Sequence, residues 1–320
     1  MHEIADRLLA ASAAGRPIAV ATAISVEGSA PRTVGTSMAY DGSAVIGSIA
    51  GGCVEGAVVE VCDEVLADGA PRTVEYGVDD ETAFSVGLTC GGQIRVHVQL
   101  LTPELLAALG DAAPIEVCRE YTEPAPVERH MIIFGAMEFS AALAAAAGVL
   151  GYRVTVCDPR GLFATPERFP TAEVVVEWPT IWLARTSVDE RTVICVLAHD
   201  DRFDAEIIAQ SLALPVAFVG AMGSRRTHER RLASLRDRGV SEQRIARLHS
   251  PIGLDLGAST PEETAVSILA EVLAARTGAT GGPLRGASGS IHGSRGSSLA
   301  AAAFSDGAQD SGALLDLPHA

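Results

Sequence analysis

The sequence predicts a two-domain α/β protein, in which a mixed α+β domain precedes a doubly wound parallel sheet. Its 320 residues exceed the usual size of one domain. Beyond His130, short apolar segments alternate with segments of helical length, which is typical of parallel strands covered by helices on both faces. Before that residue, several strands follow one another through short turns, including an Asp41-Gly42 hairpin signal, which favours antiparallel pairing.

The first domain is expected over residues 1–110, and a linker rich in Pro and Glu is expected over residues 111–128. The domain opens with an amphipathic helix that places Ile4 and Leu8 on one face, together with Leu9. A second helix is expected over residues 54–66, where apolar residues recur at helical spacing. The predicted strands lie within residues 17–28, 30–40, 41–49, 71–78 and 90–101.

The second domain is expected over residues 129–276, and the Gly-, Ser- and Ala-rich residues 277–320 are expected to be disordered. Its last helix begins with Thr260 as the N-cap and Pro261 in the first turn. Its predicted strands lie within residues 130–135, 152–158, 174–179, 191–200 and 215–221, and its other helices within residues 141–151, 204–214 and 224–239.

Charge and composition exclude several classes of protein. The formal net charge of −16 argues against nucleic acid as a partner, because phosphate binding needs clustered basic residues. No apolar stretch reaches the roughly 20 residues of a membrane helix, and the N-terminus lacks a signal-peptide pattern. The six cysteines are scattered without a Cys-x-x-Cys pair, which fits neither a zinc site nor a disulfide framework. We therefore expect a cytoplasmic protein with no membrane partner.

One cysteine stands at a helix start. Cys53 follows Gly51 and Gly52 and directly precedes the second predicted helix. Glycine permits unusual backbone conformations, and the amides and dipole of a helix N-terminus favour an anion. The Cys53 thiol is therefore expected to lose its proton easily, which makes it a candidate catalytic group and a candidate ligand for a soft metal. Glu55, in the same turn, could cap the helix, accept a hydrogen bond or act as a base. Three other cysteines fall inside predicted elements and are expected to be structural: Cys62, Cys157 and Cys195.

The first strand–helix turn of the second domain has an incomplete dinucleotide fingerprint. A GxGxxG motif is expected there, but the three glycine positions hold Gly135, Met137 and Ser140. Gly135 is a candidate cofactor-binding residue, as is Asp158, which follows the next strand where an acid would bind a ribose hydroxyl. The fold is thus Rossmann-like, but the fingerprint disfavours classical NAD(P) binding.

Two polar clusters follow the later strands, at the carboxyl ends where open parallel sheets bind ligands. The first contains His199, a candidate cofactor-binding residue, and Asp200; as metal ligands this pair lacks a convincing third partner. Asp200 could instead only cap the next helix, and the arginines of the second cluster could form a solvated face. That cluster opens a helix and would suit a phosphate or another anion; its candidate residues are Gly220, Gly223, Ser224 and Arg225.

Several motifs together resemble the XdhC/CoxI family, in order, from about residue 18 to residue 276. The motifs are EGSAPRTVGTSMAYDGSAVIGSIAGGCVEG, CGG, GYRVTVCDPRGLFATPERFP, LAHDDRFD, FVGAMGSRRTHERR and SPIGLDLGASTPEETAVSILAE. Each motif alone is modest, but all of them in register are specific. The family's GGCxEG motif falls on residues 51–56, while Met137 stands where many members have a glycine.

This resemblance implies an accessory factor for molybdenum hydroxylases such as xanthine dehydrogenase and carbon monoxide dehydrogenase. Such a factor binds the molybdenum cofactor, as molybdopterin or its cytosine dinucleotide form. Gly51, Gly52 and Cys53 are then candidate cofactor-binding residues, because the two glycines would let a bulky anionic pterin approach the backbone. The factor shields the cofactor while a cysteine desulfurase provides the terminal sulfur, and then delivers it to the apo-hydroxylase. The resemblance also implies a small N-terminal domain joined to a Rossmann domain, and a homodimer.

The sequence leaves three functions open. The first is a molybdenum-cofactor carrier and maturation factor without turnover of its own. The second is an NAD(P)-dependent oxidoreductase, which the incomplete fingerprint at Gly135 disfavours. The third is an interaction protein without a ligand, whose acidic surface binds a basic partner.

Overall fold

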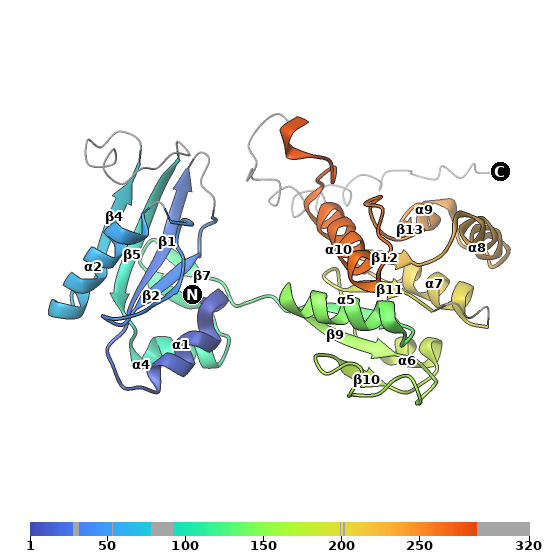
Figure 1. The fold of residues 1–320 in the computed structure, drawn as a ribbon, viewed down its shortest axis with the longest axis horizontal. Helices are drawn as coiled ribbons and strands as arrows, with labels where there is room; N and C mark the ends of the chain where they lie inside the picture. Colours follow the sequence, from blue (N-terminus) through green and yellow to red (C-terminus); the bar gives the residue numbers. More distant parts are fainter. Residues whose placement is uncertain (28–31, 53, 78–91, 199, 201, 287–320) are drawn as a thin grey trace, which may run out of the picture. The chain divides into compact units, whose positions relative to one another are not determined.

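The computed structural model of the protein describes residues 1–27, 32–52, 54–77, 92–198, 200 and 202–286. It contains two compact units, whose main bodies are Met1–Val127 and Glu128–Pro283 (Figure 1).

The first unit is built on an antiparallel sheet with the strand order β3-β2-β1-β5-β4. The central strand, β1, pairs with both β2 and β5, so the N-terminal and later strands share one sheet. These strands agree with the segments that the sequence predicts. They are β1 (Ala19–Glu27), β2 (Ser37–Tyr40), β3 (Val45–Gly47), β4 (Arg72–Tyr76) and β5 (Gln93–Leu100).

Helices cover both faces of this sheet. On one face α2 packs through Val58, Cys62 and Val65. On the other face α1 and α4 contribute Leu8 and Leu105 to a second core. The first six residues of β1 are buried because this strand lies between the two layers. The helices are η1 (His2–Ile4), α1 (Ala5–Ser12), α2 (Glu55–Asp68) and α4 (Pro103–Gly110).

The segment expected to be a linker, residues 111–128, is largely part of the first unit. It contains a two-stranded hairpin in which Ile115 and Val117 are buried in the same core as α1 and α4. Although Pro and Glu dominate its composition, alternate apolar residues give the first strand one buried face. The connection between the units is therefore shorter than expected. The hairpin strands are β6 (Ile115–Cys118) and β7 (Tyr121–Glu123).

The α-ammonium group of Met1 is buried against this hairpin. Its nitrogen lies 2.6 Å from Oε2 of Glu123 and donates to the carbonyl of Gly35 at 3.0 Å. Oε1 of Glu123 accepts a hydrogen bond from the amide of His2. Burial lowers the pKa of the Met1 ammonium, and Glu123 opposes this by stabilising its charge. Glu123 thus joins the hairpin to the first turn of the chain.

The second unit contains a parallel sheet with the order β10-β9-β8-β11-β12-β13. Counted along this unit, the order is 3-2-1-4-5-6, so the expected Rossmann-like doubly wound sheet is confirmed. The strand order reverses between β8 and β11, where ligands bind in such folds. The strands are β8 (Arg129–Phe134), β9 (Tyr152–Cys157), β10 (Glu173–Val175), β11 (Val193–Val196), β12 (Phe218–Ala221) and β13 (Leu248–His249).

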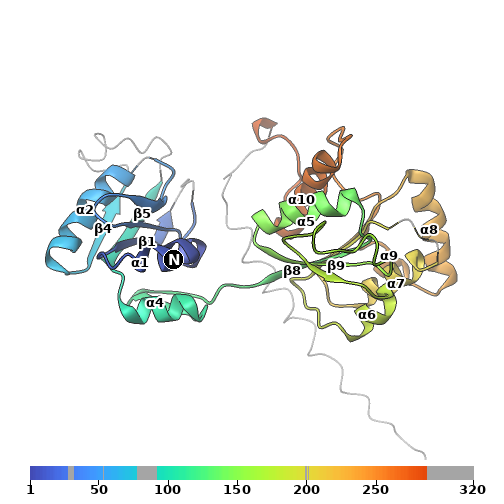
Figure 2. The same cartoon turned by 60° about the horizontal axis from the view of Figure 1, so that its bottom comes forward.

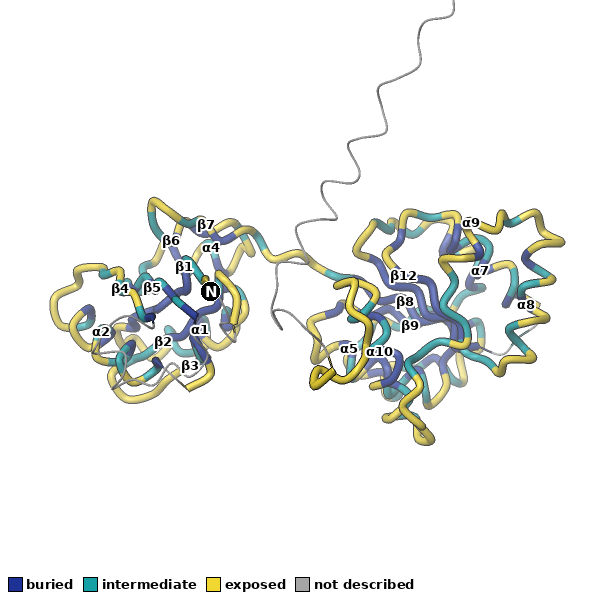
Figure 3. The backbone as a smooth tube through the Cα atoms, turned by 90° about the horizontal axis from the view of Figure 1, so that it is seen from above, coloured by how far each residue is buried: buried dark blue, intermediate teal, exposed yellow. Residues whose placement is uncertain are grey.

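Helices cover this sheet on both sides (Figure 2). Met131 and Ile133 of β8 face α5 and α10, whereas Ile132 and Phe134 face α6 and α7, because side chains alternate along a strand. Figure 3 shows the strands as the buried centre of the unit. The helices are α5 (Glu138–Val149), α6 (Pro179–Arg185), α7 (Asp204–Ala213), α8 (Arg225–Asp237), α9 (Glu242–Ile245) and α10 (Pro261–Thr277).

Three short elements of this unit, α6, α9 and β13, lie outside the predicted segments. They have seven, four and two residues, too few to produce a periodic signal. The expected start of α10 is confirmed, with a capping box between Thr260 and Glu263. The expected disordered tail lies mostly outside the described residues, which end at Gly286 in η2 (Leu284–Gly286). Within the described ranges, no helix is long and apolar enough to cross a membrane.

Candidate functional site

One carboxylate organises the loop before α2. Oε1 of Glu55 accepts hydrogen bonds from the Ser48 hydroxyl at 2.6 Å and from the amides of Ala50 and Gly51 at 3.0 and 2.9 Å. Oε2 accepts a hydrogen bond from the amide of Gly52 at 2.7 Å. Two further amides donate at 3.2 Å, those of Ile49 and Val54. The loop therefore wraps around the side chain of the first residue of α2.

These contacts discriminate between the roles expected for Glu55. Burial raises its pKa, but the Ser48 hydroxyl and the loop amides outweigh burial and lower the pKa to about 2. A group with so low a pKa is a poor general base near neutral pH, and its oxygens are already engaged. The geometry therefore favours the role of a hydrogen-bond acceptor that holds the loop, rather than the role of a catalytic base.

Gly51 and Gly52 have φ angles of +84° and +114°, in the region that glycine adopts most readily. Both are exposed, and a Cβ on either would meet nothing within 4 Å among the described residues. Backbone conformation rather than close packing therefore requires glycine here. Both amides already donate to Glu55, so an anion would not find them free. Cys53 lies outside the described residues.

In the second unit, Gly135 follows β8 at the switch point. Its φ is +105°, and a Cβ there would lie 2.7 Å from the amide nitrogen of Ala198, in the segment after β11. The glycine thus lets the ends of two neighbouring strands approach each other. Packing of the protein against itself accounts for this first glycine of the fingerprint.

Asp158 is bound to the same turn. Its Oδ2 accepts a hydrogen bond from the amide of Ala136 at 2.8 Å, and Arg160 pairs with both carboxylate oxygens. Burial raises the pKa of Asp158, but Arg160 and the amide of Ala136 outweigh it and lower the pKa. A ribose hydroxyl would therefore have to displace Arg160 to reach this carboxylate.

The turn between β12 and α8 contains the other predicted residues. Gly220 lies within β12, where a Cβ would approach Cδ1 of Ile252 to 2.3 Å, so packing requires this glycine. Ser224 is the N-cap of α8, and its Oγ accepts a hydrogen bond from an amide of the first turn at 3.1 Å. Gly223 precedes this cap, and Arg225 follows it with an exposed side chain. Of this cluster, Arg225 is the residue best placed to meet a ligand.

His199, like Cys53, lies outside the described residues. In the part of the chain that the structure describes, no three His, Cys, Asp or Glu residues gather as a metal site would require. Burial raises the pKa of three thiols to about 12, in accord with their expected structural role: Cys62, Cys157 and Cys195.

Two family profiles match the chain in sequence order. The XdhC Rossmann domain matches residues 131–272, and the XdhC and CoxI family matches residues 11–77. The chain belongs to the XdhC and CoxI family.

Three bacterial proteins are similar to this family member. The uncharacterized protein YqeB of Escherichia coli K12 is 30% identical over 83% of this chain, which spans about half of that relative, 45%. A protein of Bacillus subtilis 168, named as a probable subunit of xanthine dehydrogenase, is 25% identical over 80% of this chain and 92% of the relative. The molybdenum cofactor insertion chaperone PaoD of Escherichia coli K12 is 25% identical over 82% and 84%.

A crystal structure described as a xanthine dehydrogenase from Bacillus halodurans shares the fold of this XdhC/CoxI chain. The TM-score is 0.70 over 85% of this chain and 95% of that one. The sequences are 23% identical, so the likeness concerns the fold alone.

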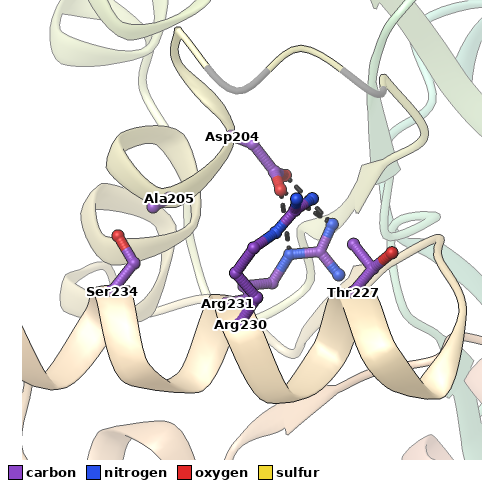
Figure 4. A pocket seen from close by; sticks show the side chains of 6 residues that line it. All are labelled: Asp204, Ala205, Thr227, Arg230, Arg231 and Ser234. Atoms are coloured by element: carbon purple, nitrogen blue, oxygen red, sulfur yellow. Dashed lines mark hydrogen bonds and ion pairs between the residues drawn. The ribbon is translucent and has the colours of Figure 1, made fainter.

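This XdhC/CoxI chain also has a buried ion pair that none of the sequence motifs marks as a site. Arg231 of α8 is 3% exposed, and its Nη2 lies 2.9 Å from Oδ2 of Asp204, the first residue of α7 (Figure 4). The guanidinium also donates to Oγ of Ser250 and to the carbonyl of Met222, both at 3.1 Å. Arg231 thus ties together segments that follow three strands. Its position four residues before the buried Leu235 is the sequence signal for an inward-facing side chain.

A second dyad that the sequence does not predict lies at the edge of the same sheet. Nδ1 of His249 is 2.9 Å from Oε1 of Glu271, whose Oε2 accepts a hydrogen bond from the amide of Gly253 at 2.6 Å. The imidazole stacks on the ring of Phe218, with centroids 4.1 Å apart. These contacts fix the orientation of the ring. No motif marks it beforehand, because β13 is only two residues long.

Proposed function

We propose that this chain is a maturation factor that carries the molybdenum cofactor as cargo for a xanthine dehydrogenase-type hydroxylase. It protects the cofactor, supports its sulfuration by a cysteine desulfurase and delivers it to the apo-enzyme. The family membership supports this role, as do relatives named for xanthine dehydrogenase and for molybdenum cofactor insertion.

The observation that carries the proposal is the loop held by Glu55. Its carboxylate fixes residues 48–52 and the start of α2, on either side of position 53. Gly51 and Gly52 are exposed, so the backbone of this loop is accessible to a ligand such as a pterin. In this proposal Cys53 provides the thiolate, and Glu55 positions it. In the second unit, taken by itself, Ser224 and Arg225 are the candidate groups for binding an anion.

The contacts around Gly135 and Asp158 weaken the alternative of an NAD(P)-dependent oxidoreductase. The close approach of Ala198 requires a glycine at position 135. The Asp158 carboxylate already binds Arg160 and the amide of Ala136. The proposal also includes three features of the expected carrier: the cytosine dinucleotide form as one form of the cofactor, a homodimer and a cytoplasmic location.

The test is the cofactor content of protein purified without oxygen from cells that make molybdenum cofactor. We expect the wild type to hold pterin and molybdenum near one per chain and Cys53→Ser to lose them. Cys118→Ser is the matched control, because Cys118 is a free, half-buried cysteine elsewhere in the first unit, and it should retain the cargo. Equal pterin in Cys53→Ser and wild type would refute the role of the thiol. No pterin in any variant, where a known carrier loads, would refute the proposed function.

A further inference from the structure

We propose that an arginine-rich surface formed by residues 225–247, which comprise α8, α9 and their flanks, binds an acidic face of the hydroxylase that receives the cofactor. The identity of the partner rests on the proposed function. The surface itself follows from charge, exposure and packing of the second unit.

The segment concentrates positive charge in an acidic chain. Residues 225–247 contain eight arginines and three carboxylates, whereas the whole chain has a formal net charge of −16. The chain contains no lysine, so arginine provides all of its permanently cationic side chains. Guanidinium groups bind carboxylates through paired N–H donors, so this composition suits recognition of acidic side chains.

Most of this charge is available at the surface. Of the eight arginines only Arg231 is buried. Arg236 is paired with Glu242 at 2.7 Å. By contrast, Arg226, Arg238 and Arg244 are exposed and have no acidic partner within the described part of the chain. The surface therefore retains unneutralised positive charge.

The packing of α8 does not explain its composition. Only Arg231 and Leu235 of its thirteen residues are buried. Arg225 and Arg226 lie in the first turn, near the positive end of the helix dipole, where a cation is unfavourable. The free helix gains nothing from these two residues, whereas an anionic partner would offset their repulsion.

A pocket of about 180 Å³ lies beside this surface, between α7 and α8. Figure 4 shows Arg230 and Arg231 reaching from α8 toward Asp204. The two arginines and one aspartate give the lining a formal charge of +1, so it favours a carboxylate side chain of the partner over a cationic one. The lining residues are Asp204, Ala205, Thr227, Arg230, Arg231 and Ser234.

A folded acidic protein fits this surface better than a nucleic acid. The +5 of residues 225–247 leaves the rest of the chain with a formal charge of −21. The phosphates of a nucleic acid would extend beyond the segment and meet this negative charge, whereas a protein presents a bounded acidic face. At 0.1 M salt, charges further apart than about 10 Å are largely screened from each other. The positive surface can therefore attract an acidic partner although the net charge of the chain is negative.

The test measures binding of the chain to the purified, cofactor-free xanthine dehydrogenase-type hydroxylase of the same genome, between 50 and 300 mM NaCl as roughly the range in which charge contacts respond. The triple variant Arg226→Gln, Arg238→Gln, Arg244→Gln is expected to raise Kd at least tenfold at low salt and to flatten the salt dependence. The control triple Arg7→Gln, Arg119→Gln, Arg285→Gln removes the same charge from exposed sites outside the surface and should bind as the wild type does.

Two results would overturn the proposal: equal Kd for the surface triple and the control triple, or tighter binding of a 20-base-pair DNA duplex than of the hydroxylase. Pterin content, measured on the same preparations, separates this failure from that of the proposed function. If all variants carry pterin and bind the hydroxylase equally, only the assignment of the surface is wrong. If the wild type neither carries pterin nor binds the hydroxylase, the proposed function falls with it.

Discussion

Arg231 and Asp204 form an ion pair between two helices, with Nη2 2.9 Å from Oδ2 and the arginine side chain 1% exposed. The pair connects the start of α7 with the middle of α8, and the same guanidinium binds the turns that follow β12 and β13. Arg231 therefore connects the segments that follow β11, β12 and β13, at the carboxyl ends of these strands.

Replacing Arg231 by Met should lower the free energy of unfolding by about 3–5 kcal/mol, because it removes one partner of a buried ion pair. Urea unfolding followed by circular dichroism measures this change. The control is Arg236→Met, which breaks the exposed pair with Glu242 and should change the free energy of unfolding far less, because water screens that pair. Equal losses in the two variants would contradict a special role of Arg231.

Gly135→Ala should destabilise the second unit by about 1–3 kcal/mol, because the new Cβ would collide with the backbone of Ala198 at a positive φ. Gly148→Ala in α5 meets nothing within 4 Å and should stabilise by about 0.5–1 kcal/mol. Differential scanning calorimetry should show a lower melting temperature than that of the wild type for Gly135→Ala and a higher one for Gly148→Ala. If Gly135→Ala left the melting temperature unchanged, close packing would not be the reason for this glycine.

Glu55→Gln should destabilise the first unit by about 1–3 kcal/mol at pH 7, because an amide cannot accept all the hydrogen bonds that the carboxylate receives. The folded pKa of about 2 lies below the ordinary value of 4.5, so the stabilisation is present above pH 4.5 and is lost as the pH falls toward 2. The difference between wild type and variant should therefore shrink over this range. Glu60→Gln, on an exposed turn of α2, is the control and should leave the stability at pH 7 close to that of the wild type.

The neutral form of His130 should stabilise the second unit at neutral pH. Burial lowers its pKa to about 4, and Arg153 acts in the same direction. The unfolded chain takes up a proton near pH 6.5 and the folded chain near pH 4, so stability falls between these values as the pH is lowered. Unfolding of wild type and His130→Gln at pH 7 and pH 5 tests this. If the stability of the wild type rose relative to that of the variant when the pH was lowered, the prediction would be wrong.

The regular elements follow from the sequence, whereas the contacts of the site do not. Periodicity and turn residues predict the strands of both sheets and the long helices, because each has enough residues to repeat. The hairpin containing Ile115 and the strand containing His249 escape prediction, since composition or brevity hides their pattern. The sequence suggests that Gly135 and Asp158 bind a ligand, because a motif gives the positions of residues but not the protein groups that they contact. Their partners, Ala198 and Arg160, become visible only once the strands are placed side by side.

The role of Glu55 shows the same difference between residue type and geometry. The sequence predicts a carboxylate at the start of a helix, and a base and an acceptor are equally consistent with that position. The fold decides because the preceding loop turns its amides inward onto the side chain. Similarly, Arg231 has the spacing of a core residue but the chemistry of a surface residue, so its burial is evident only with Asp204 opposite it.

The ammonium group of Met1 has a practical consequence for chemical labelling. No side chain of the given sequence carries a primary amine, because lysine is absent, and Met1 is 0% exposed, with its ammonium group beside Glu123. Amine-reactive dyes and cross-linkers should therefore leave this ammonium group unmodified while the first turn of the chain stays folded. Their reaction rate would instead report how often the first turn of the chain separates from the β6–β7 hairpin, so a routine reagent becomes a site-specific probe of local opening.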